Sequence, residues 1–176
     1  DQTRSINFTF DGKPYTGYAG DTLASALLAN GVHLVGRSFK YHRPRGILSA
    51  GSEEPNALIT IGDDAYQDPN SRATTAQLFE GMTAKSQTKM GLLSFDFMAV
   101  NDFLSPLLGA GFYYKSFMLP AAFWEKIYEP IIRKAAGLGS LSGLADPGQY
   151  DKGYLHCDLL VSGRGASGLM AALAAA

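Results

Sequence analysis

Cysteine is almost missing from this chain: Cys157 is the single one among 176 residues. One thiol closes no internal disulfide and cannot supply the set of thiolates that holds an iron–sulfur cluster. The three histidines share no metal-ligand spacing, so the sequence predicts no metal site. Because a disulfide framework is missing, we expect a reducing, cytoplasmic setting.

A strong charge of either sign and a long apolar run are missing as well. The net charge of −1 gives no basic field of the kind that attracts nucleic acid or an anionic lipid surface. Residues 1–5 are unlike the start of a signal peptide, and the uncharged run 103–114 is too short to cross a bilayer. We therefore expect no nucleic-acid partner and no membrane segment.

The first pattern that is present predicts two strands and a helix. Residues 6–10 alternate apolar with polar side chains, Asp11-Gly12 is a hairpin turn signal, and residues 13–18 continue as a second extended piece. Residues 21–31 carry both helix-end signals, with Asp21 as the expected N-cap and Gly31 as the stop. Two strands followed by a packed helix are how a β-grasp domain begins.

Further pieces complete a small mixed sheet in residues 1–92. Residues 57–61 are predicted to form a buried strand, and residues 77–83 are a candidate for another. The basic segment 37–46 contains a proline and is predicted to be a loop. Its cations can bind a phosphate or an acidic patch, but a solvated or interface-lining loop is the favoured interpretation. They are Arg37, Lys40, His42, Arg43 and Arg45.

Residues 93–152 are predicted to be a helical, aromatic connector. Aromatic side chains crowd the interval 112–128, and Pro106, Pro120 and Pro130 divide it into short helices. Such a segment makes a poor free-standing domain. Two interpretations stay open: the connector wraps another domain or subunit, or it packs on its own chain.

Residues 153–176 carry the most specific pattern, a G-x-G-x-x-G turn between an apolar run and a helix-forming run. Residues 157–162 suit a buried parallel strand, and residues 169–176 favour a helix. In this context the first glycine permits a tight turn, the second lets a pyrophosphate approach, and the third allows close helix packing. The predicted dinucleotide-binding residues are Gly163, Arg164, Gly165, Ala166, Ser167 and Gly168.

Two features qualify this prediction of a Rossmann domain. Arg164 stands where a small residue is usual, so that it either contacts phosphate or crowds the site, and Ser167 is a milder departure. The acidic residue that binds ribose is expected about twenty positions further on, beyond Ala176. We therefore expect the chain to be a fragment that holds only the first strand and helix of that domain.

Together these segments resemble the N-terminal region of the alpha subunits of heterotetrameric sarcosine oxidases, over the whole chain. The resemblance rests on the basic segment 37–46, on residues 53–58, and on the Gly-rich turn that follows residues 154–158. It implies oxidative demethylation of sarcosine to glycine with oxygen, giving hydrogen peroxide and either formaldehyde or 5,10-methylenetetrahydrofolate. It also implies NAD in this subunit, FMN at the alpha/beta interface, FAD in the beta subunit, and beta, gamma and delta subunits as partners. The catalytic residues are then expected outside this chain.

Related amine and opine oxidase subunits and plant-type ferredoxins share the β-grasp part, with a cluster held by a C-x4-C-x2-C run. Laid after residues 45–46, that spacing falls on Ser49, Glu54 and Ala57. Hard oxygen donors and a methyl group do not replace thiolates, so the resemblance predicts a ferredoxin-like domain without its cluster. The fold class expected for the whole chain is thus α+β, a cluster-less β-grasp domain followed by a connector and the beginning of a Rossmann domain.

Two alternatives remain at this point. The residues do not specify the substrate, so a related amine or opine dehydrogenase subunit that has lost its cluster fits as well. A β-grasp interaction module without catalysis also fits, if the Gly-rich turn binds nothing.

Overall fold

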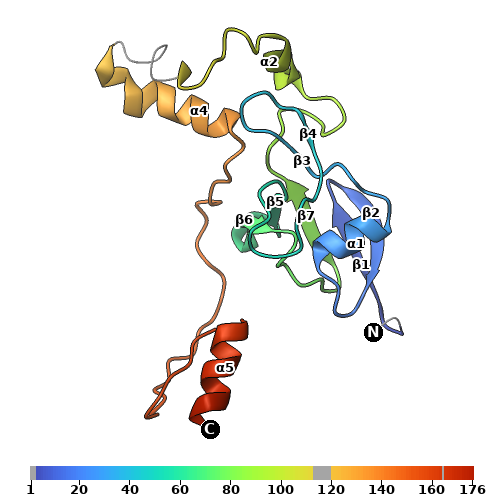
Figure 1. Cartoon of the computed structure of the whole chain (residues 1–176), viewed down its shortest axis with the longest axis vertical. Helices are drawn as coiled ribbons and strands as arrows, with labels where there is room; N and C mark the ends of the chain where they lie inside the picture. Colours follow the sequence, from blue (N-terminus) through green and yellow to red (C-terminus); the bar gives the residue numbers. More distant parts are fainter. Residues whose placement is uncertain (1–2, 113–119, 164) are drawn as a thin grey trace. The chain divides into compact units, whose positions relative to one another are not determined.

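The computed structural model describes residues 3–112, 120–163 and 165–176, and it divides the chain into two compact units, 1–146 and 147–176 (Figure 1). The division lies within the predicted connector, and residues 1–92 and 93–146 share one unit. The domain boundaries 1–92, 93–152 and 153–176 therefore stay a prediction.

Unit 1–146 begins with the hairpin that the sequence predicts. β1 (Ser5–Phe10) pairs antiparallel with β2 (Lys13–Tyr18), and every residue of β1 has a partner in β2. The turn residues Asp11 and Gly12 have φ angles of 49° and 77°, so both lie in the left-handed region that a two-residue type I′ turn requires. The alternation in β1 buries Ile6, Phe8 and Phe10 on one face.

Three more strands extend the hairpin into a mixed sheet of order β2-β1-β7-β5-β6. β7 (Met82–Ser86) runs parallel to β1, while β5 (Leu58–Ile61) is antiparallel to β7 and to the edge strand β6 (Asp68–Arg72). The strand predicted at 57–61 is confirmed, and the one proposed at 77–83 begins only at Met82. β6 was not predicted because Asp68-Pro69-Asn70 lacks apolar alternation. An edge position tolerates such a proline.

Helix α1 (Leu23–Ala29) packs on this sheet and ends before Gly31, as predicted. Its N-cap is Thr22, whose side chain accepts a hydrogen bond of 3.2 Å from the Ser25 amide. The predicted cap, Asp21, is wrong because its carboxylate accepts from the Tyr18 amide instead. A Cβ at Gly17 on β2 would come within 2.9 Å of Ala26 Cβ, so this glycine lets the helix lie close to the strand.

The core lies between α1 and the sheet. Its buried members come from β1, α1, β5, β7 and the segments between them, and they are all apolar: Ile6, Phe8, Phe10, Leu23, Ala24, Ala26, Leu27, Val35, Ala57, Ile59, Ala73, Leu78, Met82 and Ala84. These side chains, which come from residues 6 to 84, form one continuous hydrophobic core.

The segment predicted as a loop at 37–46 contains a short two-stranded ribbon. β3 (Gly36–Arg37) pairs antiparallel with β4 (Pro44–Arg45), and we call residues 36–45 the basic hairpin. A 3-10 turn, η1 (Asp64–Tyr66), follows β5. After the sheet come the short helical elements of the connector: η2 (Phe97–Ala99), α2 (Val100–Phe103), η3 (Ala121–Phe123), η4 (Trp124–Tyr128) and α4 (Glu129–Ala135).

Unit 147–176 contains one helix, α5 (Ala166–Ala175), in the part that the structure describes. The strand predicted at 157–162 is wrong for this unit, since these residues take no strand pairing. A strand needs a neighbour for its backbone N–H and C=O groups, and residues 147–163 and 165–176 offer none. No helix of the described residues is both long and apolar enough to span a membrane.

Candidate functional site

The predicted dinucleotide site is a tight turn at the start of α5. Gly163 has a φ of 122°, a conformation that L side chains rarely adopt. A Cβ on Gly168 would lie 2.4 Å from the carbonyl oxygen of Gly163, so the first helical turn touches the backbone before it. Two glycines of the pattern are therefore required by the geometry of the turn itself.

The middle of the pattern faces open space. Gly165 is the N-cap of α5 in an extended conformation, and a Cβ there would meet no atom within 4 Å. Ala166 and Ser167 are exposed, and the first turn holds no acidic side chain. Helix N-termini present unpaired amides and a partial positive charge. Arg164, the departure noted in the sequence, lies outside the described residues.

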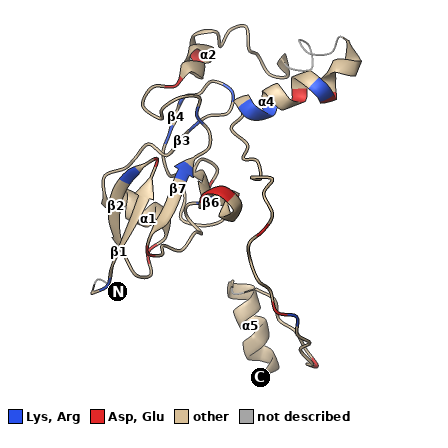
Figure 2. Ribbon diagram, turned by 180° about the vertical axis from the view of Figure 1, so that it is seen from behind, with Lys and Arg blue, Asp and Glu red and all other residues tan. Residues whose placement is uncertain are grey.

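The predicted cationic segment is held mainly by its own chain. Arg37 donates from Nε and Nη2 to the Leu93 carbonyl at 2.9 and 2.6 Å, and from Nη1 to the His42 carbonyl at 2.9 Å. Lys40 Nζ donates to the Gly109 carbonyl at 3.0 Å. Figure 2 colours the basic residues of β3 and β4 blue.

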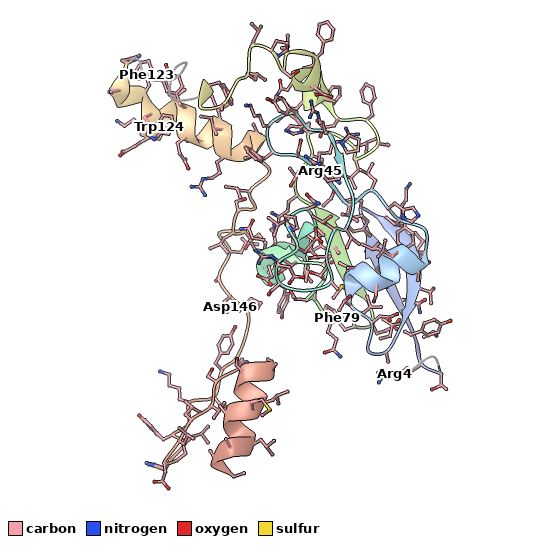
Figure 3. The ribbon with its side chains drawn as sticks, viewed as in Figure 1. Arg4, Arg45, Phe79, Phe123, Trp124 and Asp146 are labelled. Carbon is pink, nitrogen blue, oxygen red and sulfur yellow. The ribbon has the colours of Figure 1, made fainter. Side chains whose placement is uncertain are left out.

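Arg43 and His42 complete these contacts. Arg43 pairs with Asp102 at 2.6 Å, and this carboxylate raises the pKa of the guanidinium. His42 is buried, with Nε2 at 2.9 Å from the Ala135 carbonyl. The basic hairpin thus lines an interface with residues 93–112 and 120–136 of the same chain, and these four cations are already engaged there. In the described part of the chain, Arg45 is the one cation of the five whose side chain makes no hydrogen bond or ion pair, and it is labelled in Figure 3.

The connector packs on the basic hairpin and still exposes much apolar surface. Phe103 is 86% exposed and Leu107 78% exposed. Phe123 and Trp124, labelled in Figure 3, are partly exposed on η3 and η4. An apolar cavity of about 500 Å³ lies between Phe39 of the hairpin and Trp124 and Ile131 of the connector. The connector thus packs on its own chain, and its wrapping of another domain or subunit stays a prediction.

The three positions that match cluster ligands lie in the loop 48–57. Ser49 is half-buried, and Glu54 and Ala57 are buried. The Glu54 carboxylate accepts from the amides of Leu48, Ser49 and Asn56. In the described part of the chain, no three His, Cys, Asp or Glu side chains gather as a metal site would require.

Two of these roles were missed from the sequence. His42 was grouped with the surface cations, and no local pattern showed that Nδ1 would lie 3.0 Å from Asp96 Oδ1 and Nε2 2.9 Å from the Ala135 carbonyl. Glu54 was treated only as a missing ligand. The available signal was an acidic residue at a ligand position, which the ferredoxin-like fold buries. Because a buried carboxylate needs donors around it, this position indicates a hydrogen-bonded Glu54.

Comparison with known proteins finds a family for the first part of the chain and relatives for nearly all of it. Residues 3–89 match a family described as a 2Fe-2S iron-sulfur cluster binding domain, which confirms the ferredoxin-like α+β domain. The chain is 62% identical to sarcosine oxidase subunit alpha of Rhizobium meliloti (strain 1021) over 175 residues, 99% of this chain and 18% of that protein. The sarcosine oxidase alpha subunits of Corynebacterium sp. strains U-96 and P-1 are 35% identical over 96% and 98% of this chain and 13% of their own length.

A solved structure, L-proline dehydrogenase from P. horikoshii, aligns with 51% of this chain and 16% of its own at 24% identity and a TM-score of 0.39. That likeness is too distant to bear on fold or function. The chain spans 13–18% of the length of the curated relatives it matches. Over nearly its whole length, this chain belongs with the sarcosine oxidase alpha subunits, of which it matches one part.

Proposed function

We propose that this chain is the NAD-binding part of the alpha subunit of a heterotetrameric sarcosine oxidase. The observation that carries the proposal is the turn of residues 163–168 at the N-terminus of α5, in a chain 62% identical to such a subunit. Bound NAD supplies a nicotinamide ring that can carry hydride. The residues of this chain would bind and orient its two phosphates.

The shape of the turn fits that role. Gly163 turns the chain sharply, and Gly168 brings the helix against the carbonyl of Gly163. Between them, Gly165 leaves a space that a side chain would fill and that a pyrophosphate needs. The helix N-terminus beyond it attracts anions through its free amides and its dipole.

The surface of α5 supports a larger domain around this turn. Leu169, Met170 and Leu173 are each more than 60% exposed, and the helix carries no charged residue. A helix that is apolar on all sides is stable in water only when other elements cover it. By this proposal residues 153–176 begin a Rossmann domain.

The reaction of the whole protein would be the oxidative demethylation of sarcosine to glycine. Oxygen is reduced to hydrogen peroxide, and the methyl carbon leaves as formaldehyde or as 5,10-methylenetetrahydrofolate. FMN would lie at the alpha/beta interface and FAD in the beta subunit, with gamma and delta subunits completing a cytoplasmic assembly. We assign no catalytic residue to this chain, whose contribution is cofactor binding and assembly.

An iron–sulfur cluster does not fit the residues of the ferredoxin-like domain. The only cysteine of the chain is Cys157, so residues 1–146 contain no thiolate. The positions of the ligand spacing hold Ser49, Glu54 and Ala57, and the Glu54 carboxylate is already engaged with the loop around it. We therefore propose a domain that serves packing and assembly without electron transfer.

A valine at position 165 tests the NAD site sharply. Because a Cβ at Gly165 meets no protein atom within 4 Å, Gly165→Val should leave the fold unchanged and fill only the space of the pyrophosphate. NAD released by denaturing the purified full-length protein should be stoichiometric in the wild type and absent in the variant. Gly153→Val is the matched control, since Gly153 of the same unit also has open space around it.

Retention of NAD by the folded Gly165→Val protein would refute the assignment. If the wild type itself carries no dinucleotide, the interaction module without catalysis becomes the better interpretation. Sarcosine turnover with hydrogen peroxide release distinguishes the oxidase from an amine or opine dehydrogenase, which would reduce an acceptor dye without consuming oxygen.

A further inference from the structure

The loop 48–57 contains a carboxylate almost completely withdrawn from water. Glu54 is 1% exposed, and its Oε2 atom accepts from the Leu48 amide at 2.8 Å and the Ser49 amide at 2.6 Å. The Ser49 hydroxyl adds a longer contact of 3.3 Å, and Oε1 accepts from the Asn56 amide at 2.8 Å. All these donors are neutral, and all belong to the same loop.

Such an arrangement stabilises an anion with neutral donors. Burial by itself raises the pKa of a carboxyl group, yet the hydrogen bonds from Ser49, Asn56 and Leu48 outweigh it and the pKa of Glu54 is lowered. Backbone amides that converge on one anion from both sides of a loop form an anion-binding concavity, or nest. Glu54 is thus held as a carboxylate by the loop that surrounds it.

The backbone of this nest is fixed from outside by other contacts. Thr74 Oγ1 donates to the Gly51 carbonyl at 2.7 Å, and Arg72 Nε donates to the Glu54 carbonyl at 3.2 Å. The Ala73 amide donates to the Ala57 carbonyl at 3.0 Å. None of these bonds involves the Glu54 side chain, so they should keep the loop in place when that side chain is shortened.

Laid on this sequence, the C-x4-C-x2-C spacing of cluster-binding ferredoxins also makes position 54 the second of its three ligand positions. A cluster thiolate is an anion, and amides around it stabilise its charge as they stabilise a carboxylate. We propose that the loop 48–57 is a retained anion nest and that the Glu54 carboxylate is its built-in occupant, in the place where a cluster-binding domain holds its metal centre. The nest therefore takes a small carboxylate once its own is removed.

Formate rescue of Glu54→Ala tests the nest in the full-length protein. Hydrogen exchange of a peptide covering residues 46–57, measured by mass spectrometry at neutral pH, should become at least about tenfold faster in the variant, because three amides lose their acceptor. A formate titration at constant ionic strength should restore the protection with saturation, whereas chloride should not. Glu53→Ala is the control: this neighbouring carboxylate is exposed and accepts from the Gly51 amide at 3.2 Å, so its removal can affect that amide but should leave the amides of Leu48, Ser49 and Asn56 protected.

Protection in Glu54→Ala equal to that in the wild type would overturn the proposal, and so would equal recovery with formate and chloride. If Glu54→Ala does not fold, Glu54→Gln provides the same measurement. Its amide nitrogen faces backbone donors, so exchange in residues 46–57 should again be faster, and wild-type exchange there would count against the nest. None of these outcomes depends on whether residues 163–168 bind NAD.

Discussion

His42 Nδ1 lies 3.0 Å from Asp96 Oδ1, and both side chains are almost fully buried between the basic hairpin and the connector. Nδ1 makes no hydrogen bond in the described part of the chain, so the two side chains meet only by close contact. Asp96 is fixed by the amides of Met90 and Met98 at 2.7 and 2.8 Å, and His42 Nε2 faces the Ala135 carbonyl. The imidazole of His42 thus contacts two residues far from it in the sequence, Asp96 and Ala135.

Asp96→Asn should loosen the connector from the hairpin. The amide keeps the shape of the side chain but removes the charge beside His42 and places an N–H₂ group against a backbone donor. We expect a loss of about 1–3 kcal/mol in the opening free energy of residues 93–136. Native-state hydrogen exchange of the full-length protein measures it.

The double variant His42→Asn with Asp96→Asn separates the interaction energy between the two side chains from the contribution that each makes alone. If the two side chains interact, the combined effect should be smaller than the sum of the single effects by about 0.5–2 kcal/mol. Strict additivity would show that Asp96 acts only as an acceptor for the backbone amides.

Arg37→Lys should also weaken this interface. The guanidinium makes two hydrogen bonds to the Leu93 carbonyl and one to the His42 carbonyl, and an ammonium group cannot reproduce this planar fork. We expect a loss of about 1–2 kcal/mol in the same exchange measurement. Arg45→Lys is the matched control, because Arg45 is an exposed residue of β4, the strand that pairs with β3. This change should leave the opening free energy unaltered. Equal effects of the two would rule out the fork as the cause.

Gly168→Ala should damage the dinucleotide turn by a different route from Gly165→Val. The new Cβ would lie 2.4 Å from the Gly163 carbonyl oxygen, so the backbone of the turn must move. We expect NAD to be retained at least about tenfold more weakly, with the helix start itself displaced. Equilibrium dialysis gives the affinity, and undiminished binding would mean that the turn does not hold the phosphates. Gly153→Ala is the control.

Glu54 should make the stability of the ferredoxin-like domain depend on acid pH. Its pKa is lowered in the folded chain, so its contribution is complete above its ordinary value of 4.5 and is lost as pH falls through the folded-state pKa. The difference in opening free energy between the wild type and Glu54→Gln should therefore be constant near neutral pH and shrink below about pH 4.5. A difference that does not change with pH would show that the carboxylate charge makes no contribution.

Much of the fold was predictable because short-range chemistry decides it. The alternation in residues 6–10, the Asp11-Gly12 turn and the stop at Gly31 each express a local backbone preference, and the structure has all three. The N-cap was missed by one residue because Asp21 and Thr22 are both good caps, and only the bond from the Tyr18 amide separates them. Strand β6 was missed since its pairing with β5 comes from position at the sheet edge and not from its own side chains.

The candidate site was likewise predictable in one part and not in another. The glycine pattern at 163–168 is a statement about backbone freedom, and the turn at Gly163 and Gly168 agrees with it. The surroundings of His42 and Glu54 could not be predicted in this way, because their partners come close to them only in the folded chain. The residue types histidine and glutamate do not predict burial, whereas the structure buries His42 beside acceptors and Glu54 among donors.

The hairpin, the first helix, the glycine turn and the lack of cluster thiolates each follow from the residue types present and their spacing. The folded chain was needed to show that the basic segment holds the connector and that Glu54 lies within a nest of amides. Backbone preferences act over a few residues, whereas burial and charge compensation depend on groups that come together only when the chain folds.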